Sequence, residues 1–298
     1  MKSYPLVSIV TINYKQSGVT NELLASLDKI TYPSYEVIVV DNGSGGGDAD
    51  KIDLSHRSVR LIRSSTNLGF AGGNNLGIKD ARGKYILLLN NDTEVAPGFL
   101  EPMVELLEGN SSIGAVSPKI KFYYQPNTIQ YAGFTAMNPF TLRMSAIGSH
   151  QVDTGEFDAT RPTHFAHGCA MMVPRSVIDD VGLMPEMYFL YYEEHDWSKM
   201  ILRAGYSIYY QPQSVVLHKE SISVSKASPL KTYYINRNRI LFMRRNLGLL
   251  HKGVSSVYLI CVSMPKNTLS YLFKAQYQHL NAYWKAIFWN LSHKAHTQ

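Results

Sequence analysis

The first hundred residues alternate between short apolar runs and stretches with apolar residues at helical spacing. Aliphatic and β-branched runs predict strands over residues 6–12, 36–40, 60–63 and 85–89. Helical spacing of apolar residues predicts helices over residues 20–29, 73–81 and 98–107. Strands that alternate with helices indicate an α/β fold, with a mostly parallel sheet that is covered by helices on both faces.

The pattern becomes less regular after the first hundred residues. Weak periodicity and many turn formers over 122–165 predict loops and short strands that shape an acceptor pocket. Further elements are predicted as helices over 175–181 and 194–204 and as strands over 207–211 and 215–218. A basic helical stretch over 230–247 then leads into an aromatic segment over 254–289. We therefore expect a main domain over 1–220 and a C-terminal helical extension over 221–298.

Composition narrows the class of protein. The 298 residues are 45% hydrophobic and 17% charged, which is typical of a globular protein. The net charge of +6 suits anionic partners such as nucleotides or an acidic membrane face. The sequence does not indicate nucleic-acid binding, because it lacks a dense basic stripe interleaved with stacking aromatic residues. Cys169 and Cys261 are far apart in the sequence, which favours a reducing cytosol over a disulfide framework or a zinc site. We expect neither a signal peptide nor a membrane-spanning helix.

Two aspartates follow predicted strands. Asp41 closes the second strand before a glycine-rich loop, and Asp92 ends the sequence Asn90-Asn91-Asp92 after the strand over 85–89. Ligands of parallel α/β sheets bind beyond the carboxyl ends of the strands, so both positions are candidate site residues. Asp41 could accept a hydrogen bond from a base or a ribose, and Asp92 could hold a divalent cation that bridges a diphosphate. Each is also typical of an ordinary turn or helix cap.

A nine-residue segment, Asn67-Leu-Gly-Phe-Ala-Gly-Gly-Asn-Asn75, opens a predicted helix with three glycines and three asparagines. Small residues let the backbone approach a ligand closely and present free N–H groups. The segment is not the dinucleotide-binding fingerprint, because no Gly-x-Gly-x-x-Gly follows the first strand. So many small and amide residues favour a ligand-binding loop over a purely structural turn.

Acidic residues are concentrated at Glu193-Glu194-His195-Asp196, directly after the aromatic run 188–192. One carboxylate at a helix start is typical of capping, since the helix dipole favours negative charge there. Three carboxylates beside aromatic residues indicate a general base and a wall that holds a sugar ring. His218 ends the last predicted strand; alone it is typical of a core histidine, but facing Asp92 across a cleft it becomes a second metal ligand.

These motifs occur in a defined order, which is Val7–Tyr14, Val39–Ser44, Asn67–Gly77, Leu89–Val95 and Tyr191–Trp197. Together they resemble the family 2 inverting glycosyltransferases with a GT-A fold, a Rossmann-like nucleotide-diphospho-sugar transferase fold. The resemblance is greatest to the bacterial rhamnosyltransferase-like members, and it runs from about residue 7 to about residue 246. It implies a GT-A catalytic domain within residues 1–220.

The resemblance also implies roles for individual residues. It places Asp92 at the last position of the family's Asp-x-Asp metal motif and His218 at its late metal-binding histidine, for Mg²⁺ or Mn²⁺. It places Glu194 at the catalytic base, where the family usually has aspartate, so the base stays open between Glu194, Glu193 and Asp196. The residues expected to bind the nucleotide sugar are Thr11, Asn13, Asp41, Asn67, Gly69, Gly73, Asn74, Asn90 and Asn91.

The implied reaction is a single displacement at an anomeric carbon with inversion. dTDP-rhamnose ranks first as donor and UDP-hexoses second, and the acceptor is expected to be a lipid-linked oligosaccharide of O-antigen, capsule or a similar polymer. Two alternatives are a nucleotide-sugar-binding protein that has lost catalysis, suggested by Asn90 and Glu194, and a nucleotidyltransferase. The second is disfavoured, because Thr11–Lys15 replaces the glycine-rich loop such enzymes carry after their first strand.

The C-terminal aromatic segment has two interpretations. It predicts either a helix at the cytoplasmic face of the inner membrane or the packing of a helical subdomain or homodimer. The residues that suit a membrane interface are Tyr258, Leu259, Leu272, Phe273, Trp284, Phe288 and Trp289, among Lys266, Lys274 and Lys285.

Overall fold

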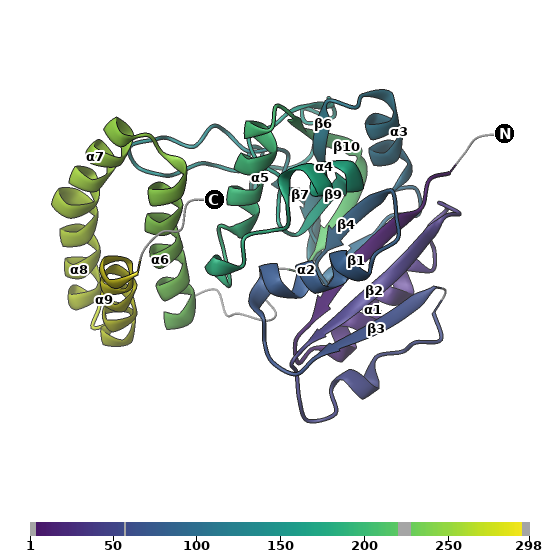
Figure 1. Cartoon of the computed structure of the whole chain (residues 1–298), viewed down its shortest axis with the longest axis horizontal. Coiled ribbons are helices and arrows are strands. Elements are labelled where there is room, and N and C mark those ends of the chain that lie inside the picture. The colour runs from purple at the N-terminus through teal and green to yellow at the C-terminus, as the bar shows by residue number, and fades with distance from the viewer. Residues whose placement is uncertain (1–3, 57, 220–227, 294–298) are drawn as a thin grey trace. The chain divides into compact units, whose positions relative to one another are not determined.

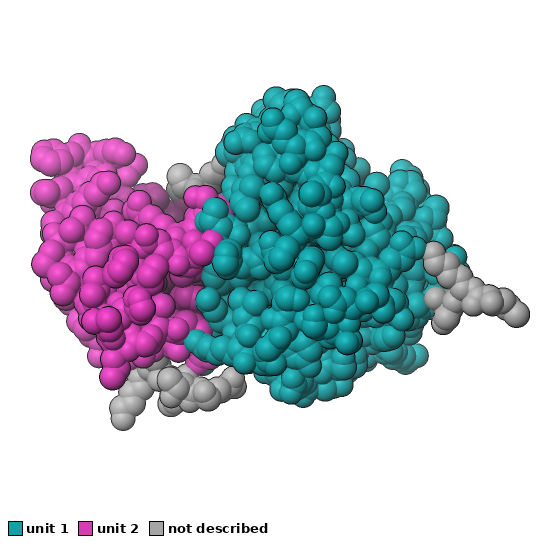
Figure 2. Space-filling model, turned by 90° about the horizontal axis from the view of Figure 1, so that it is seen from above, with its two compact units in different colours: residues 1–135, 146–189, 193–223 teal, residues 136–145, 190–192, 224–298 magenta. Residues whose placement is uncertain are grey.

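The computed structural model describes residues 4–56, 58–219 and 228–293. The chain divides into two compact units, which Figure 2 shows in different colours. Unit 1 contains residues 1–135, 146–189 and 193–223, and unit 2 contains residues 136–145, 190–192 and 224–298. The boundary expected between residues 220 and 221 falls within 220–227, outside the described residues.

Unit 1 is built on a ten-stranded sheet within the described part of the chain (Figure 1). Its strands are β1 (Val7–Asn13), β2 (Tyr35–Asn42), β3 (Val59–Ser64), β4 (Tyr85–Leu89), β5 (Thr93–Val95), β6 (Ile113–Phe122), β7 (Gln125–Tyr131), β8 (Arg161–Pro162), β9 (Ala170–Pro174) and β10 (Ser207–His218). The strand order is β3-β2-β1-β4-β9-β6-β10-β5, with β7 beside β6 and β8 beside β10. β1, β2, β3 and β4 pair in parallel, as do β6 and β10, whereas β9 runs antiparallel to β4 and β6. The predicted α/β fold with a mostly parallel sheet is confirmed.

Helices cover both faces of this sheet. They are α1 (Ser17–Leu27), α2 (Gly69–Asp80), α3 (Glu101–Gly109), α4 (Arg175–Val181) and α5 (Glu193–Arg203), with short 3-10 turns η1 (Ala49–Lys51) and η2 (Glu186–Tyr188). One core cluster joins α1 and α3 to one face, and another joins α2, α4 and α5 to the other. Neighbouring strand residues point to opposite faces, so Ile9 of β1 lies in the first cluster and Val10 in the second.

The structure differs from the predicted elements in several strands. β5, β6 and β9 were not predicted, and the two strands expected over 207–211 and 215–218 form one strand, β10, with an irregularity between Gln211 and Val215. β6 escapes the apolar pattern because it contains Lys119, whose side chain is nevertheless only 3% exposed. Its ammonium lies 2.9 Å from Asp153 and 2.5 Å from Asp158, which neutralise its charge inside the fold.

Unit 2 is helical. Its elements are α6 (Pro229–Asn246), α7 (Leu249–Tyr258), the π-helical turn η3 (Leu259–Ser263), α8 (Met264–Phe273) and α9 (Tyr277–Ser292). Ser228 caps α6 by accepting a hydrogen bond from the Lys231 backbone. The π turn ends two residues before Pro265, which lacks the N–H that a regular helix would need there. None of the described helices is long and apolar enough to cross a membrane.

The core of unit 2 contains part of the segment that was expected to lie at a membrane interface. Leu259 is only 5% exposed, and Trp284 packs against the same cluster, so both pack a helical subdomain instead. Phe273 and Phe288, by contrast, are 86% and 59% exposed. The aromatic segment is therefore divided between a core and an exposed surface.

Candidate active site

The carboxyl ends of β4 and β10 bring Asp92 and His218 together. Asp92 lies in the turn between β4 and β5, and His218 is the last residue of β10, paired with Thr93 of β5. β10 runs in the same direction as β4. Both β4 and β6 are antiparallel to β9, and β10 is parallel to β6. The His218 Nε2 and Asp92 Oδ1 atoms lie 3.2 Å apart, and both side chains are buried. These are the two residues that the sequence assigned to a metal.

Hydrogen bonds orient the His218 ring. Its Nδ1 lies 2.8 Å from the Gln130 side-chain oxygen, which can only accept, so we assign the Nδ1 proton to this bond and direct Nε2 at Asp92. Burial opposes a charge on His218, yet the adjacent Cys169 and Asp92 hold its pKa well above the usual value. A proton on Nε2 therefore occupies the place that a metal ion would take.

Lys219 lies beside this pair but is occupied by other partners. Its backbone N–H donates to the Asp92 carbonyl at 2.8 Å, which fixes the turn that carries Asp92. Its ammonium lies 2.9 Å from Glu94, contacts Glu22, and stands 4.7 Å above the Tyr123 ring. Burial lowers the pKa of Lys219, but the two carboxylates outweigh it and raise the pKa. Lys219 therefore balances acidic neighbours.

The three acidic residues at the start of α5 have different environments. Glu193 is 2% exposed and Asp196 is fully buried, with the Tyr188 hydroxyl donating to its carboxylate at 2.8 Å. Tyr188 is itself fully buried, so it does not form the sugar-binding wall expected of the run 188–192. The Glu194 side chain is 16% exposed, which makes it the most accessible carboxylate of the three.

A histidine stabilises the charge of Glu194. Its carboxylate lies 3.2 Å from His195 Nδ1. Burial would raise the pKa of Glu194, but the neighbouring His195 outweighs that effect and lowers it. His167 is itself held neutral, because burial and the neighbouring His218 lower its pKa to about 3. Glu194 is thus an ionised carboxylate at neutral pH.

One tripeptide, His167-Gly168-Cys169, touches both halves of the site. His167 interacts electrostatically with His218 and Glu194. Gly168 lies against Glu194, and a Cβ atom on it would stand 3.4 Å from Glu194 Cγ. The Cys169 carbonyl accepts the Asn90 N–H at 2.8 Å. The candidate base and the candidate metal pair are therefore connected through three consecutive residues that the sequence analysis did not select.

Asn13, Asp41 and Asn91 are joined by a buried hydrogen-bond network. Asn13 lies opposite Asp41 in the β1–β2 register, and its amide donates to Asp41 and to Asp48, each at 2.9 Å. Thr20 of α1 donates to the Asn13 amide oxygen at 2.9 Å and accepts from Asn91 at 3.1 Å. The network links the end of β2 to the turn that carries Asp92.

Several members of this network were missed by sequence analysis. Asp48 accepts hydrogen bonds from Asn13 and Ser17; burial would raise the pKa of its carboxyl, but these bonds lower it. Ser44 and Thr20 are likewise placed by the fold. Thr11 of β1, which was selected, is fully buried, and its hydroxyl has no hydrogen-bond partner among the described residues.

The glycines of the Asn67–Asn75 segment have packing roles. Gly69 begins α2 with φ +74°, and a Cβ on it would stand 2.3 Å from the Phe189 carbonyl oxygen. That carbonyl accepts the Phe70 N–H at 2.7 Å. A Cβ on Gly73 would stand 2.9 Å from Ile12. The segment is glycine-rich because the first turn of α2 packs closely against backbone and strand.

The asparagines of the same segment form hydrogen bonds with the segment itself and with neighbouring parts of unit 1. Asn67 accepts from the Gly69 N–H at 2.9 Å and from Asn42 at 3.2 Å. Asn74, which is buried, donates to the Phe70 carbonyl at 3.1 Å. Asn75 donates to the Met184 carbonyl at 2.8 Å and accepts the Met184 N–H. These bonds fix the loop between β3 and α2 beside the end of β2.

Solved structures share this fold at low sequence identity. A mannosyltransferase from Pyrobaculum calidifontis, solved with GDP-mannose and Mn²⁺, is 14% identical with a TM-score of 0.59, covering 98% of this chain and 88% of that one. The structure of GalNAc-T7 with UDP, GalNAc and Mn²⁺ is 15% identical with a TM-score of 0.63, covering 89% of this chain and 57% of that one. These likenesses agree with the GT-A arrangement that the sequence predicted.

Sequence relatives are also distant. An uncharacterised protein of Sinorhizobium fredii is 30% identical over 75% of this chain, which spans only 25% of that protein's length. The low-salt glycan biosynthesis hexosyltransferase Agl10 of Haloferax volcanii is 25% identical, covering 79% of this chain and 74% of that protein. The N-acetylglucosaminyl-diphospho-decaprenol L-rhamnosyltransferase of Mycobacterium tuberculosis is 24% identical, covering 74% of this chain and 78% of that protein.

The family model described as glycosyl transferase family 2 matches residues 8–182. This range includes more than half of the chain and contains β1 to β4, the turn with Asp92 and the tripeptide 167–169. The chain belongs to glycosyl transferase family 2.

Proposed function

We propose that this glycosyltransferase moves L-rhamnose from dTDP-rhamnose to a lipid-linked oligosaccharide or cell-surface polysaccharide, with inversion at the anomeric carbon. The observation that carries the proposal is the buried pair of Asp92 and His218, 3.2 Å apart, together with the ionised carboxylate of Glu194, which the tripeptide 167–169 connects to this pair. A nucleotide-diphosphate site needs charge neutralisation on one side of the reacting carbon and a base on the other. This site contains candidates for both.

Asp92 and His218 would hold Mg²⁺ or Mn²⁺. The donor atoms fit, because adjacent ligands of an octahedral ion at about 2.1 Å stand about 3 Å apart, close to the separation of this pair. The described residues contain no cluster of three or more histidine, cysteine or acidic side chains that could hold a metal. Two protein ligands suit an ion that completes its coordination with water and substrate phosphates. When bound, such an ion stabilises the negative charge of the departing diphosphate.

Glu194 would act as the catalytic base. Its low pKa keeps it ionised at neutral pH, so it can accept the proton of an acceptor hydroxyl. The hydroxyl oxygen forms the new bond to the anomeric carbon while the bond to the diphosphate breaks, and the electron pair leaves with the diphosphate. Attack and departure on opposite faces of one carbon invert its configuration. The burial of Glu193 and Asp196 supports the choice of Glu194.

The donor and acceptor are proposed from likeness to relatives. The Mycobacterium tuberculosis relative is a rhamnosyltransferase that acts on a decaprenol-linked sugar, which supports dTDP-rhamnose and a lipid-linked acceptor. The Haloferax volcanii relative is a hexosyltransferase, which supports a UDP-hexose as the alternative donor. O-antigen and capsule synthesis are the settings in which we propose that such an acceptor occurs.

The first test is a donor panel. Purified protein with Mn²⁺ or Mg²⁺ is mixed with dTDP-rhamnose and with UDP- and GDP-hexoses, and release of nucleoside diphosphate is followed. We expect release from dTDP-rhamnose, lost in Asp92→Ala and retained in the control Asp53→Asn, whose side chain is 50% exposed. If UDP is released from a UDP-hexose and no nucleoside diphosphate is released from dTDP-rhamnose, the UDP-hexose is the donor and the proposed donor is wrong. If the protein binds a nucleotide sugar but releases no nucleoside diphosphate even after acceptor lipid is added, it is an inactive nucleotide-sugar-binding protein.

A further inference from the structure

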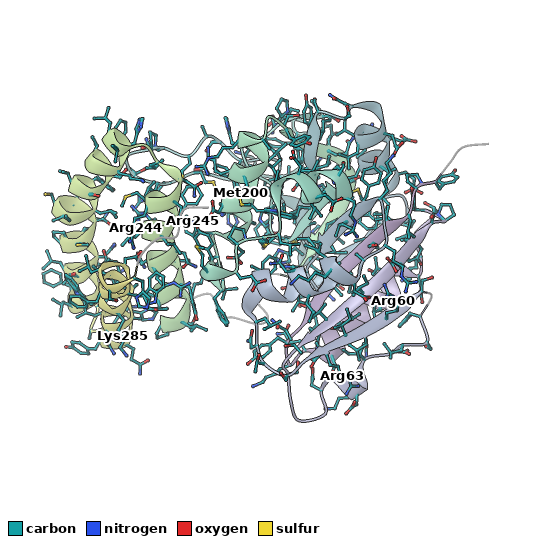
Figure 3. The ribbon with its side chains drawn as sticks, viewed as in Figure 1. Arg60, Arg63, Met200, Arg244, Arg245 and Lys285 are labelled. Atoms are coloured by element: carbon teal, nitrogen blue, oxygen red, sulfur yellow. The ribbon has the colours of Figure 1, made fainter. Side chains whose placement is uncertain are left out.

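Basic residues are distributed very unevenly along the chain. Residues 221–298 contain eleven lysines and arginines and no aspartate or glutamate, so all 23 acidic residues lie within 1–220. The modest net charge of +6 therefore conceals an acidic main domain joined to a strongly basic helical unit. Arg244 and Arg245 on α6 and Lys285 on α9 carry part of this charge (Figure 3).

Unit 2 also has an apolar surface. α7, η3 and α8 follow one another along one edge of the unit (Figure 1). Their solvent-facing side carries an apolar stripe of aliphatic residues and one cysteine. We call it the outer stripe, and it consists of Leu250, Val254, Val257, Cys261, Leu269 and Leu272. These residues recur at intervals of three, four and eight positions, as residues on one helix face do. Leu250 is 77% exposed and Val257 is 61% exposed.

The opposite side of the same helices is buried and partly polar. Ser255 is fully buried, and its hydroxyl donates to the Pro139 carbonyl. Ser263 is 5% exposed and accepts a hydrogen bond from Asn267. Leu259 is the apolar member of this buried side. The helices thus bury serines and expose aliphatic residues, the reverse of a helix whose outer side faces water.

Exposed lysines accompany the outer stripe. Lys266 of α8 and Lys274, which follows α8, are exposed. Arg237, in contrast, is internal, since its guanidinium stacks on aromatic rings, including that of Trp289 at 4.6 Å. An apolar stripe with exposed cations on the same helical segment, and no carboxylate in the unit, matches a surface with an apolar interior and anionic headgroups.

We propose that the outer stripe docks on an anionic phospholipid bilayer, with α7, η3 and α8 lying in the plane of the interface. Charge complementarity selects this occupant, because a second copy of unit 2 would place two carboxylate-free basic surfaces against each other. The inference deepens the proposed function, since docking would bring the protein to the surface that holds a lipid-linked acceptor. Its test does not require donor or activity.

The test uses vesicles of phosphatidylcholine with about one third phosphatidylglycerol. We expect the full chain to co-sediment with these vesicles and to be released by added salt or by replacement with pure phosphatidylcholine. The double variant Val257→Glu, Leu269→Glu is expected to bind at least about tenfold more weakly, since it removes apolar burial and adds repulsion. Leu54→Glu, at a residue of unit 1 that is 49% exposed, is the matched control and should bind as the wild type does.

Three results would overturn the proposal. The first is unchanged binding of the double variant when its circular dichroism and thermal unfolding match those of the wild type. The second is equal binding of the wild type to neutral and anionic vesicles. The third is a dimer in sedimentation analysis that the double variant dissociates, without vesicle binding, which would assign the stripe to a second copy. A protein that binds vesicles but releases no nucleoside diphosphate would leave this inference intact and refute only the proposed function.

Discussion

Replacing Glu194 by glutamine tests which carboxylate of α5 is the base. Glutamine has nearly the same shape, so the contacts with Gly168 and His195 are preserved while the negative charge is removed. The residue is 16% exposed, and loss of a partly solvated carboxylate should change stability little. The main expected effect of Glu194→Gln is therefore on proton transfer.

The expected loss of rate in Glu194→Gln follows from the proposed role of Glu194 as a general base. A positioned general base contributes about 10²- to 10⁴-fold in rate, and each tenfold corresponds to about 1.4 kcal/mol of activation free energy. We expect kcat of Glu194→Gln to fall about 10²- to 10⁴-fold, which corresponds to a rise of about 3–6 kcal/mol in activation free energy, with little change in KM. Asp196→Asn weakens a buried hydrogen bond from Tyr188, for which we expect a stability loss of about 1–3 kcal/mol.

The assay is steady-state release of nucleoside diphosphate with the donor that the panel identifies, together with urea unfolding of each variant. The expected result is a large fall in kcat with unchanged unfolding for Glu194→Gln, and the opposite for Asp196→Asn. If Glu194→Gln keeps wild-type kcat while Glu193→Gln or Asp196→Asn loses it in a folded protein, the assignment from burial and pKa is wrong.

Three further predictions concern the same unit. Gly77→Ala should destabilise the fold by about 1–3 kcal/mol in urea unfolding, because its Cβ would stand 2.3 Å from Val10 Cγ1; wild-type stability would contradict the packing. Mn²⁺ affinity, measured by calorimetry, should rise about tenfold per pH unit up to the elevated pKa of His218 and then level off. The reason is that the metal ion must displace the proton of His218, so an affinity that does not depend on pH would exclude His218 as a ligand. Gly168→Ala should move the acid limb of kcat/KM to higher pH, because a methyl group against the Glu194 carboxylate removes water and raises its pKa; an unchanged profile would contradict this contact.

Much of the fold was predictable because local pattern and tertiary role agree. The strand β4 matches its prediction at both ends, since Tyr85–Leu89 is an uninterrupted apolar run that is buried on both sides. α4 was predicted with the same bounds. β6 was not predicted, because the partners that allow Lys119 to be buried, Asp153 and Asp158, lie more than thirty residues away. Periodicity cannot detect a compensation that is formed only in the folded chain.

The candidate site was likewise only partly predictable from the sequence. Asp41, Asp92 and His218 could be selected because each lies at or just after the end of a strand, and strand ends share an edge of the sheet. Gln130 and Thr20 could not, because nothing in β7 or α1 marks an amide or hydroxyl as a partner of a distant residue. The role of the glycines in the segment before α2 was also hidden, since a tight approach to Phe189 or Ile12 depends on residues outside the segment.

The tripeptide 167–169 connects the two halves of the site electrostatically. His167 is kept neutral by burial and by His218, so it can stand between His218 and Glu194 without adding a second fixed charge. Burial raises the pKa of the neighbouring Cys169 thiol. A neutral His167 adds no positive charge that would oppose a cation at the proposed Asp92–His218 site, while Glu194 keeps its negative charge. A charged substitution at His167 would disturb the proposed cation site and the proposed base together, whereas a change at Gln130 would reach Glu194 only through His218.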